Sequence, residues 1–287
     1  MCPACGSVSF LKACFALRAR TTIAAVLTAL RQSDGFKMVA RDARRADAPF
    51  SCAGCAAEMT LRKGPIRVHH FAHKAPTACR LSVGETEDHF LVKLAIHDAL
   101  RDEANVAGLE LEKRLPGAVA DVFAVISGVP VAIEVQRSVL GIADVAARTA
   151  NYHRLGVAVV WVALPDGELG FSRYSPSAWE RWCHAACFGR VYYWAQGQWL
   201  RPVHYAPVSL HVPQQTWRKA GRDLSAGGYD RRSRLWVRPH AGEPVSLSAH
   251  FQRRVRPAWS GGKMVVPDCT LFIDRQPAWW TQGTDPC

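Results

Sequence analysis

The chain has 287 residues, of which 49% are apolar, so it has enough apolar surface to bury a core, and wholesale disorder is excluded. Its formal net charge of +12 favours a polyanionic partner, meaning nucleic acid or an anionic membrane surface. A chain of this size does not need its 10 cysteines as a disulfide scaffold, so we expect the reducing cytoplasm as its compartment.

Residues 1–35 are predicted to form a helical extension. The stretch 15–31 (FALRARTTIAAVLTALR) mixes arginines with apolar residues, which suits an amphipathic helix and is too broken to insert into a membrane. Met38 offers an alternative start, in which case the extension would come from an upstream start codon. The Cys2–Cys5 pair has no obvious second half-site, so we predict no metal there.

Residues 36–82 are predicted to form a small zinc-ribbon-like module. CAGC at 52–55 is followed by HHFAH at 69–73, and a Cys-x-x-Cys pair directs two thiolates to one tetrahedral ion. Because side chains alternate along a strand, His70 and His73 should not both point to the same side. Buried thiols without an ion are the competing interpretation. The predicted ligands of a structural Zn²⁺ are Cys52, Cys55, His73 and Cys79, with His70 as the alternative.

Residues 83–170 are predicted to form an α/β domain in the order α-β-β-β-α-β. The apolar residues between 85 and 103 recur near helical spacing, which predicts a helix. The run at 157–164 is continuously apolar, which is typical of a buried strand. Between them we expect strands at 109–114, 118–126 and 129–136 and a helix at about 141–154.

Two acidic residues lie on neighbouring predicted strands, Asp121 on the second and Glu134 on the third. Carboxylates that converge repel each other unless a cation lies between them, and hard oxygen ligands suit Mg²⁺ or Mn²⁺. Such an ion lowers the pKa of a bound water and stabilises charge on a scissile phosphate. Gln136 would project to the same side as Glu134 and orient the attacking water. An edge strand with Glu134 and Gln136 facing solvent explains the spacing equally well.

The run from about 35 to 164 resembles the competence protein CoiA family, within the PD-(D/E)XK nuclease superfamily. The resemblance rests on the set FSCAGC, HHFAHKAPTAC, the spaced Glu, His and Lys of 85–93, Asp121, IEVQRS and RTANYHRLG. It implies a zinc-ribbon-like module followed by a nuclease-like core, in which helices flank a central mixed sheet. The family is associated with processing or recombination of incoming DNA during natural transformation, and related domains occur in mobile elements and defence loci.

The resemblance also assigns roles to residues of the strands. Asp121 and Glu134 would hold the catalytic Mg²⁺ or Mn²⁺, and Gln136 stands where the superfamily usually has lysine. Glutamine cannot supply the positive charge with which that lysine offsets charge in the transition state. The substitution therefore favours an inactive protein, whereas the retained carboxylates favour a nuclease.

Residues on the two helices complete the expected site. Lys93 could replace the missing lysine, because it shares one helix face with Glu85 and His89. Arg148 and Tyr152, four residues apart, would contact a phosphate or position the substrate strand. Without the resemblance, both groups would be interpreted as ordinary solvated helix faces.

Two functions follow as expectations. The first is a metal-dependent DNA nuclease of the CoiA type that acts on single-stranded or branched DNA. The second is a catalytically inactive DNA-binding or recombination accessory protein. Residues 171–287 form a basic, tryptophan-rich region, and 213–258 contains ten Lys or Arg against three Asp or Glu. Aromatic residues interleaved with these charges could stack on unpaired bases, namely Trp217, Tyr229, Trp236 and Phe251.

Overall fold

A computed structural model describes residues 25–75, 77, 79, 85–136, 140–164, 173–262 and 264–281. The chain divides into two compact units, and the division falls within helix α1, after Leu94. The Cys2–Cys5 pair and most of the expected N-terminal helix lie outside the described residues. No helix within the described ranges combines the length and the apolar character needed to cross a bilayer.

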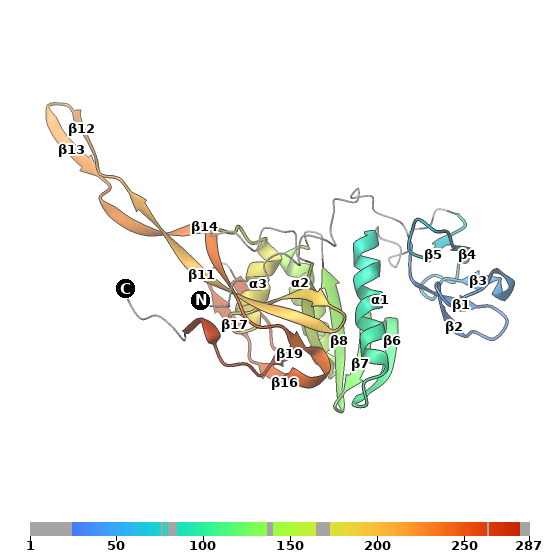
Figure 1. Ribbon diagram of the computed structural model, residues 1–287. Coiled ribbons are helices and arrows are strands. Elements are labelled where there is room, and N and C mark those ends of the chain that lie inside the picture. The colour runs from blue at the N-terminus through green and yellow to red at the C-terminus, as the bar shows by residue number, and fades with distance from the viewer. Residues whose placement is uncertain are drawn as a thin grey trace, which may run out of the picture. The chain divides into compact units, whose positions relative to one another are not determined.

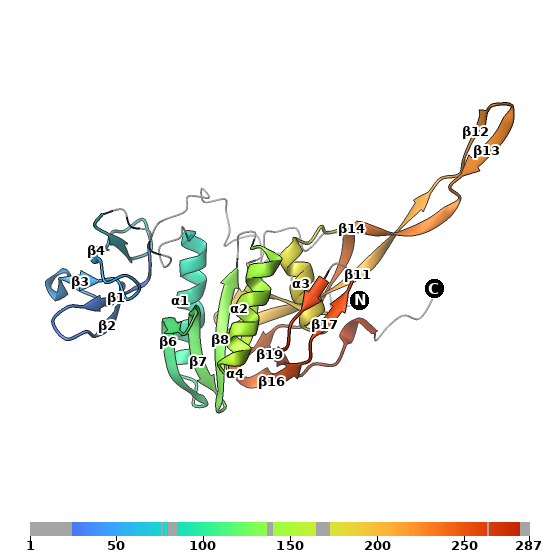
Figure 2. The same cartoon turned by 180° about the vertical axis from the view of Figure 1, so that it is seen from behind.

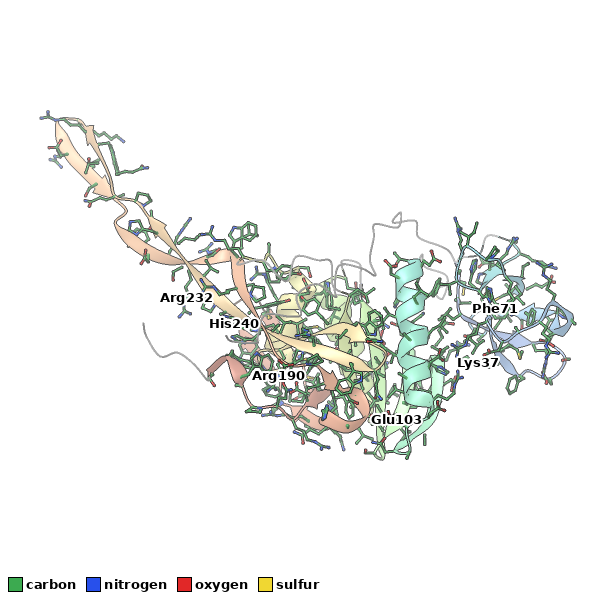
Figure 3. All side chains as sticks on the ribbon, viewed as in Figure 1. Lys37, Phe71, Glu103, Arg190, Arg232 and His240 are labelled. Carbon is green, nitrogen blue, oxygen red and sulfur yellow. The ribbon has the colours of Figure 1, made fainter. Side chains whose placement is uncertain are left out.

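The first unit contains an antiparallel sheet in the order β2-β1-β3-β4-β5 (Figure 1). Phe50 and Phe71 pack at a tilt in its core, with ring centroids 4.9 Å apart, and Phe71 is labelled in Figure 3. The elements are β1 (Thr28–Arg31), β2 (Lys37–Val39), the 3₁₀ turn η2 (Arg45–Asp47), β3 (Phe50–Ser51), β4 (Glu58–Arg62) and β5 (His70–His73).

The prediction of a helical segment up to residue 35 is wrong for residues 28–31. Residues 28–31 form β1, which pairs with β2 on one side and with β3 on the other. Val26 and Ala29 are buried in the core of this sheet. Backbone pairing on both edges and burial against other strands therefore override the helical spacing of the apolar residues.

From α1 onward the elements follow the predicted α-β-β-β-α-β order, and the strands all lie in the second unit. Strands β6, β7 and β8 are antiparallel, and β8 runs parallel to β9. Helix α2 contacts β7 and β9 and lies across one face of the sheet (Figure 2). The elements are α1 (Glu87–Arg101), β6 (Val106–Leu115), β7 (Ala118–Ile126), β8 (Val129–Gln136), α2 (Ile142–Arg154) and β9 (Ala158–Ala163).

Later strands complete this sheet. The main path runs β14-β11-β10-β9-β8-β7-β6, and β19 pairs with β9 in parallel beside β16. Strands β10 and β11 form an antiparallel hairpin around Gln196 and Gly197. The elements are α3 (Ala178–Ala186), β10 (Val191–Gln196), β11 (Trp199–Val212), β12 (Gln215–Lys219), β13 (Arg222–Ala226), β14 (Tyr229–Ala241), β15 (Val245–Ser246), α4 (Leu247–His250), β16 (Phe251–Arg256), β17 (Trp259–Gly261), β18 (Met264–Val266), β19 (Cys269–Asp274) and the 3₁₀ turn η5 (Trp279–Thr281).

Helix α3 packs on this sheet through a buried polar cluster. The carboxylate of Glu180 accepts hydrogen bonds from the hydroxyls of Tyr174 at 2.8 Å and Tyr193 at 2.6 Å. His184, one turn along the helix, stacks on the Tyr205 ring and accepts the backbone N–H of Tyr205 at its Nε2, at 3.0 Å. The acceptor role requires a neutral imidazole, and burial lowers the pKa of His184 to about 4.

This histidine predicts a loss of stability in acid. Below pH 6.5 the unfolded chain protonates His184 whereas the folded chain does not until about pH 4, so stability should fall through that window. The loss is at most roughly 3 kcal/mol. Neighbouring His204, whose pKa burial also lowers, and Arg181 disfavour the charged form of His184 further. Urea unfolding at several pH values should show a shallower pH dependence for His184→Gln, and an unchanged slope would contradict this assignment.

Candidate active site and metal centres

The turn between β7 and β8 sets the position of the two predicted carboxylates. Ser127 and Gly128 both have positive φ, at 49° and 78°, as a two-residue type I′ hairpin requires. The register that starts at this turn pairs Val122 with Ile133. The next pair outward is therefore Asp121 and Glu134, which lie opposite each other and point to the same face.

Glu134 is buried, with only 1% of its surface exposed. Arg148 of α2 donates from Nη2 to its Oε2 at 2.6 Å, and the Tyr152 hydroxyl donates to its Oε1. Gln136 is buried as well, so the alternative of a solvent-facing edge strand is wrong. Two protein donors one helical turn apart thus make the carboxylate tolerable on a buried strand.

Electrostatics keep the two donors in fixed protonation states. Burial opposes the charge of Arg148, but the carboxylates of Glu134 and Asp121 more than offset it and raise the pKa of Arg148 above its usual value. Burial, followed by the Glu134 carboxylate, raises the pKa of Tyr152 well above that of an ordinary tyrosine. Arg148 is therefore a permanent cation and Tyr152 a permanent hydrogen-bond donor at neutral pH.

The buried pair predicts strong coupling between two substitutions. Glu134→Ala should lower the free energy of unfolding by about 3 kcal/mol, because it leaves the Arg148 charge without its main partner. This value is at the lower end for a buried pair, since one-third of the Arg148 side chain is exposed. In a double-mutant cycle, Glu134→Gln with Arg148→Met should cost clearly less than the sum of the single changes. Additive losses in denaturant unfolding would contradict the coupling.

Asp121 is half-buried, and its Oδ2 accepts the backbone N–H of Val135 at 2.9 Å. The ligand atoms of Asp121, Glu85 and His89 lie within 4.8 Å of one another. Two carboxylates and an imidazole suit Mg²⁺ or Mn²⁺. This group does not include Glu134, whose oxygens accept hydrogen bonds from Arg148 and Tyr152, and the expected pairing of Asp121 with Glu134 as metal ligands stays a prediction.

Glu85 lies just before α1 rather than on it, and it still contacts His89 and Lys93 of that helix. The Oε2 atom of Glu85 lies 3.3 Å from Nδ1 of His89 and accepts a hydrogen bond from Nζ of Lys93 at 2.7 Å. Lys93 is fully buried, and its ammonium lies 5.2 Å from the centroid of the Phe90 ring. Lys93 therefore places a positive charge in the protein interior, whereas Gln136 is neutral.

In the first unit, the structure brings together the four predicted zinc ligands. Their ligand atoms lie within 4.8 Å of one another. The sulfur atoms of Cys52 and Cys79 are 3.7 Å apart, and Cys55 Sγ is 3.3 Å from His73 Nε2. His70 instead has its Nδ1 2.8 Å from the Val68 carbonyl oxygen and is not part of the group.

The donor set fits zinc in geometry and in chemistry. Two sulfurs at about 2.3 Å from one tetrahedral ion are about 3.7 Å apart, which matches the Cys52–Cys79 separation. Burial raises the pKa of the Cys52 thiol to about 11, so a cation is needed to hold it as the thiolate that binds metal. Because all four positions are filled by protein, the bound ion would be structural.

A basic cavity in the first unit was not predicted from the sequence. It has a volume of about 940 Å³ and lies beside β3, β4 and the segment 63–68. Lys63 donates to the Arg41 carbonyl, and Lys74 pairs with Glu58. The segment KGPIR has no periodicity, so no pattern could show that its charges gather with those of other segments. The cationic lining residues are Arg45, Arg62, Lys63, Arg67 and Lys74.

Two family models match the chain over the segments that contain these sites. Residues 34–82 match the N-terminal domain of competence protein CoiA, and residues 85–169 match its nuclease-like domain. Over these two segments the chain is CoiA-like. Its CoiA N-terminal segment contains the Cys/His group, and its CoiA nuclease-like segment contains Asp121 and Glu134. Neither the curated proteins nor the solved structures include a match.

Proposed function

We propose that this CoiA-like chain is a metal-dependent deoxyribonuclease that hydrolyses phosphodiester bonds during DNA processing or recombination. The observation that carries the proposal is the row of Asp121 and Glu134 across β7 and β8, in which α2 donors hold Glu134 and the Val135 N–H holds Asp121. Arg148 and Tyr152 satisfy Glu134, whereas the neighbouring Asp121 converges with Glu85 and His89, and this donor set supports a divalent cation beside Asp121.

Each side chain has a distinct role in this proposal. Asp121, with Glu85 and His89, would hold Mg²⁺ or Mn²⁺, and such an ion would supply an activated water and stabilise the charge that develops on the phosphate. Glu134, paired with Arg148, orients the water from the opposite strand. Gln136 would hydrogen-bond that water, and Lys93 would compensate charge. Arg148 and Tyr152 would position Glu134, and because Tyr152 is fully buried it cannot contact the substrate strand as expected from the sequence.

The test is incubation of the full chain with labelled single-stranded, duplex and branched DNA in Mg²⁺, Mn²⁺ or EDTA. We expect cutting that requires the metal and that is lost in Glu134→Gln, a variant that retains the size of the side chain. Full cutting in EDTA, or equal cutting by the variant, would overturn the proposal.

One observation favours the second candidate, a DNA-holding accessory protein without catalysis. Both oxygens of Glu134 already accept hydrogen bonds from protein groups, and position 136 is glutamine. This candidate predicts binding of DNA that weakens with salt, does not depend on Mg²⁺, and is never followed by cutting. The same panel of DNA substrates separates the two candidates, since only the nuclease produces fragments. In both candidate functions, the partner would be DNA. In both, zinc bound by the Cys/His group would stabilise the first unit.

A further inference from the structure

Strands β11 and β14 extend past the sheet as a two-stranded ribbon that is continued by β12 and β13 (Figure 1). Every residue of β12 and β13 is exposed. An isolated two-stranded ribbon has no core of its own and is marginally stable in water. This ribbon lies outside the segments that match CoiA. Because it has no core of its own, we expect a binding partner to cover it.

The composition of the ribbon indicates which partner fits it. Between residues 207 and 238 there are seven Lys or Arg, at 218, 219, 222, 231, 232, 234 and 238, against the two acidic residues Asp223 and Asp230. Arg232 is labelled on the ribbon in Figure 3. Large aromatic side chains are exposed among these charges, including Trp217 at 46% and Tyr229 at 55%. Cations interleaved with exposed rings complement a polyanion that has flat apolar groups, as unpaired nucleic acid does.

The register separates two different faces at the tip. Trp217 pairs with Leu224, and two residues further on Lys219 pairs with Arg222, so these four side chains share one face. Arg218 pairs with Asp223 on the opposite face, where Arg218 Nε lies 3.7 Å from Asp223 Oδ1. Among the described residues, Lys219 and Arg222 have no acidic partner. One face of the tip therefore presents a ring and two uncompensated cations.

The tip is joined to the rest of the ribbon at a close crossing of two backbones. Gly227 has φ +97°, and a Cβ there would lie 2.0 Å from the carbonyl oxygen of Pro213. Gly228 donates its N–H to the Val212 carbonyl at 2.8 Å and resumes the pairing of β11 with β14. Only glycine fits this crossing, so the backbone conformation at Gly227 sets the direction of the tip relative to the rest of the ribbon.

We propose that the tip face formed by Trp217, Lys219, Arg222 and Leu224 binds single-stranded DNA. A base stacks on the Trp217 ring beside Leu224, and the backbone phosphates contact Lys219 and Arg222. Duplex DNA hides its base faces in the stack and leaves only phosphates for this face, which makes unpaired DNA the preferred ligand. Binding at the tip does not depend on catalysis and would deliver single strands to either candidate function.

The test uses fluorescence anisotropy of the full chain in EDTA with a labelled thymidine oligonucleotide of about twenty nucleotides, and with a duplex of equal length. Trp217→Ala should weaken single-strand binding about tenfold or more, and Trp217→Phe should retain most of the affinity. Lys219→Ala and Arg222→Ala should each weaken binding and lower the salt slope by about 0.7. Arg218→Ala is the matched control, because it removes a cation from the opposite face, and should change affinity less than about twofold.

Three results would overturn the proposal. The first is an unchanged affinity of Trp217→Ala for the single strand. The second is a loss of affinity in Arg218→Ala as large as that in Arg222→Ala. The third is an equal loss of affinity for single-stranded and duplex DNA in the tip-face variants. A dimer in sedimentation that Trp217→Ala abolishes, without any change in DNA affinity, would assign the face to a second copy instead. Because EDTA removes the metal, failure of the nuclease proposal would leave these results intact, and failure at the tip would leave metal-dependent cutting intact.

Discussion

Asp121→Asn is expected to lower the rate of metal-dependent cutting by about 10³-fold or more. The amide is nearly the same size as the carboxylate, but it cannot supply the negative charge with which Asp121, Glu85 and His89 would attract a divalent cation. Preorganised charges at a reacting centre commonly account for losses of about this size. Single-turnover cleavage of the preferred DNA, with Mg²⁺ and with Mn²⁺, measures the effect.

The matched control is the stability of the same variant. After Asp121→Asn, the side-chain amide oxygen can still accept the Val135 N–H, so the midpoint of unfolding should change little. DNA affinity measured in EDTA should also stay within about twofold. Cutting by Asp121→Asn within tenfold of the unchanged chain would remove Asp121 from the reaction. Lost cutting together with a large loss of stability would instead assign it a structural role.

His73→Gln is expected to release zinc and unfold the first unit. Structural zinc contributes roughly 10 kcal/mol or more to the folding of small zinc domains. The sheet of the first unit consists of strands of two to five residues around a small apolar cluster, so its own core is too small to replace that contribution. Zinc content per chain by mass spectrometry, with limited proteolysis of residues 25–75, measures both effects.

His70→Gln is the matched control, because His70 lies on the same strand and its Nδ1 contacts the Val68 carbonyl rather than the cysteines. This variant should retain one zinc per chain and a protease-resistant first unit. Retention of zinc by His73→Gln would show that the four-residue group is not the binding site. Loss of zinc without unfolding would show that the ion is not structural.

Local patterns were sufficient to predict the elements that position the carboxylates. The predicted strands at 118–126 and 129–136 are β7 and β8, and the two-residue turn between them fixes Asp121 opposite Glu134. The preference for His73 over His70 likewise came from the two-residue period of a strand, and His73 is the histidine that lies with the cysteines. Short-range geometry decides both cases.

Long-range contacts could not be predicted in the same way. The partnership of Glu134 with Arg148 depends on how α2 crosses the sheet, and the four-residue spacing of Arg148 and Tyr152 gave only the shared helix face. Phe251 was grouped with the exposed aromatics, but it is buried against Tyr192 and Phe272. The sequence around Phe251 is basic, so its burial is decided by the pairing of β16 with β19.

The pairing of β9 has a consequence for the order of events during synthesis. All six residues of β9 are buried, and both of its edges are paired, one with β8 and the other with β10 and β19. The family match ends at residue 169, whereas β19 spans Cys269–Asp274. While the ribosome is still translating the intervening segment, the nascent strand has an open apolar edge, which is a hazard for misassembly. We therefore expect folding of the nuclease-like core to be completed only after the segment that forms β19 has left the ribosome.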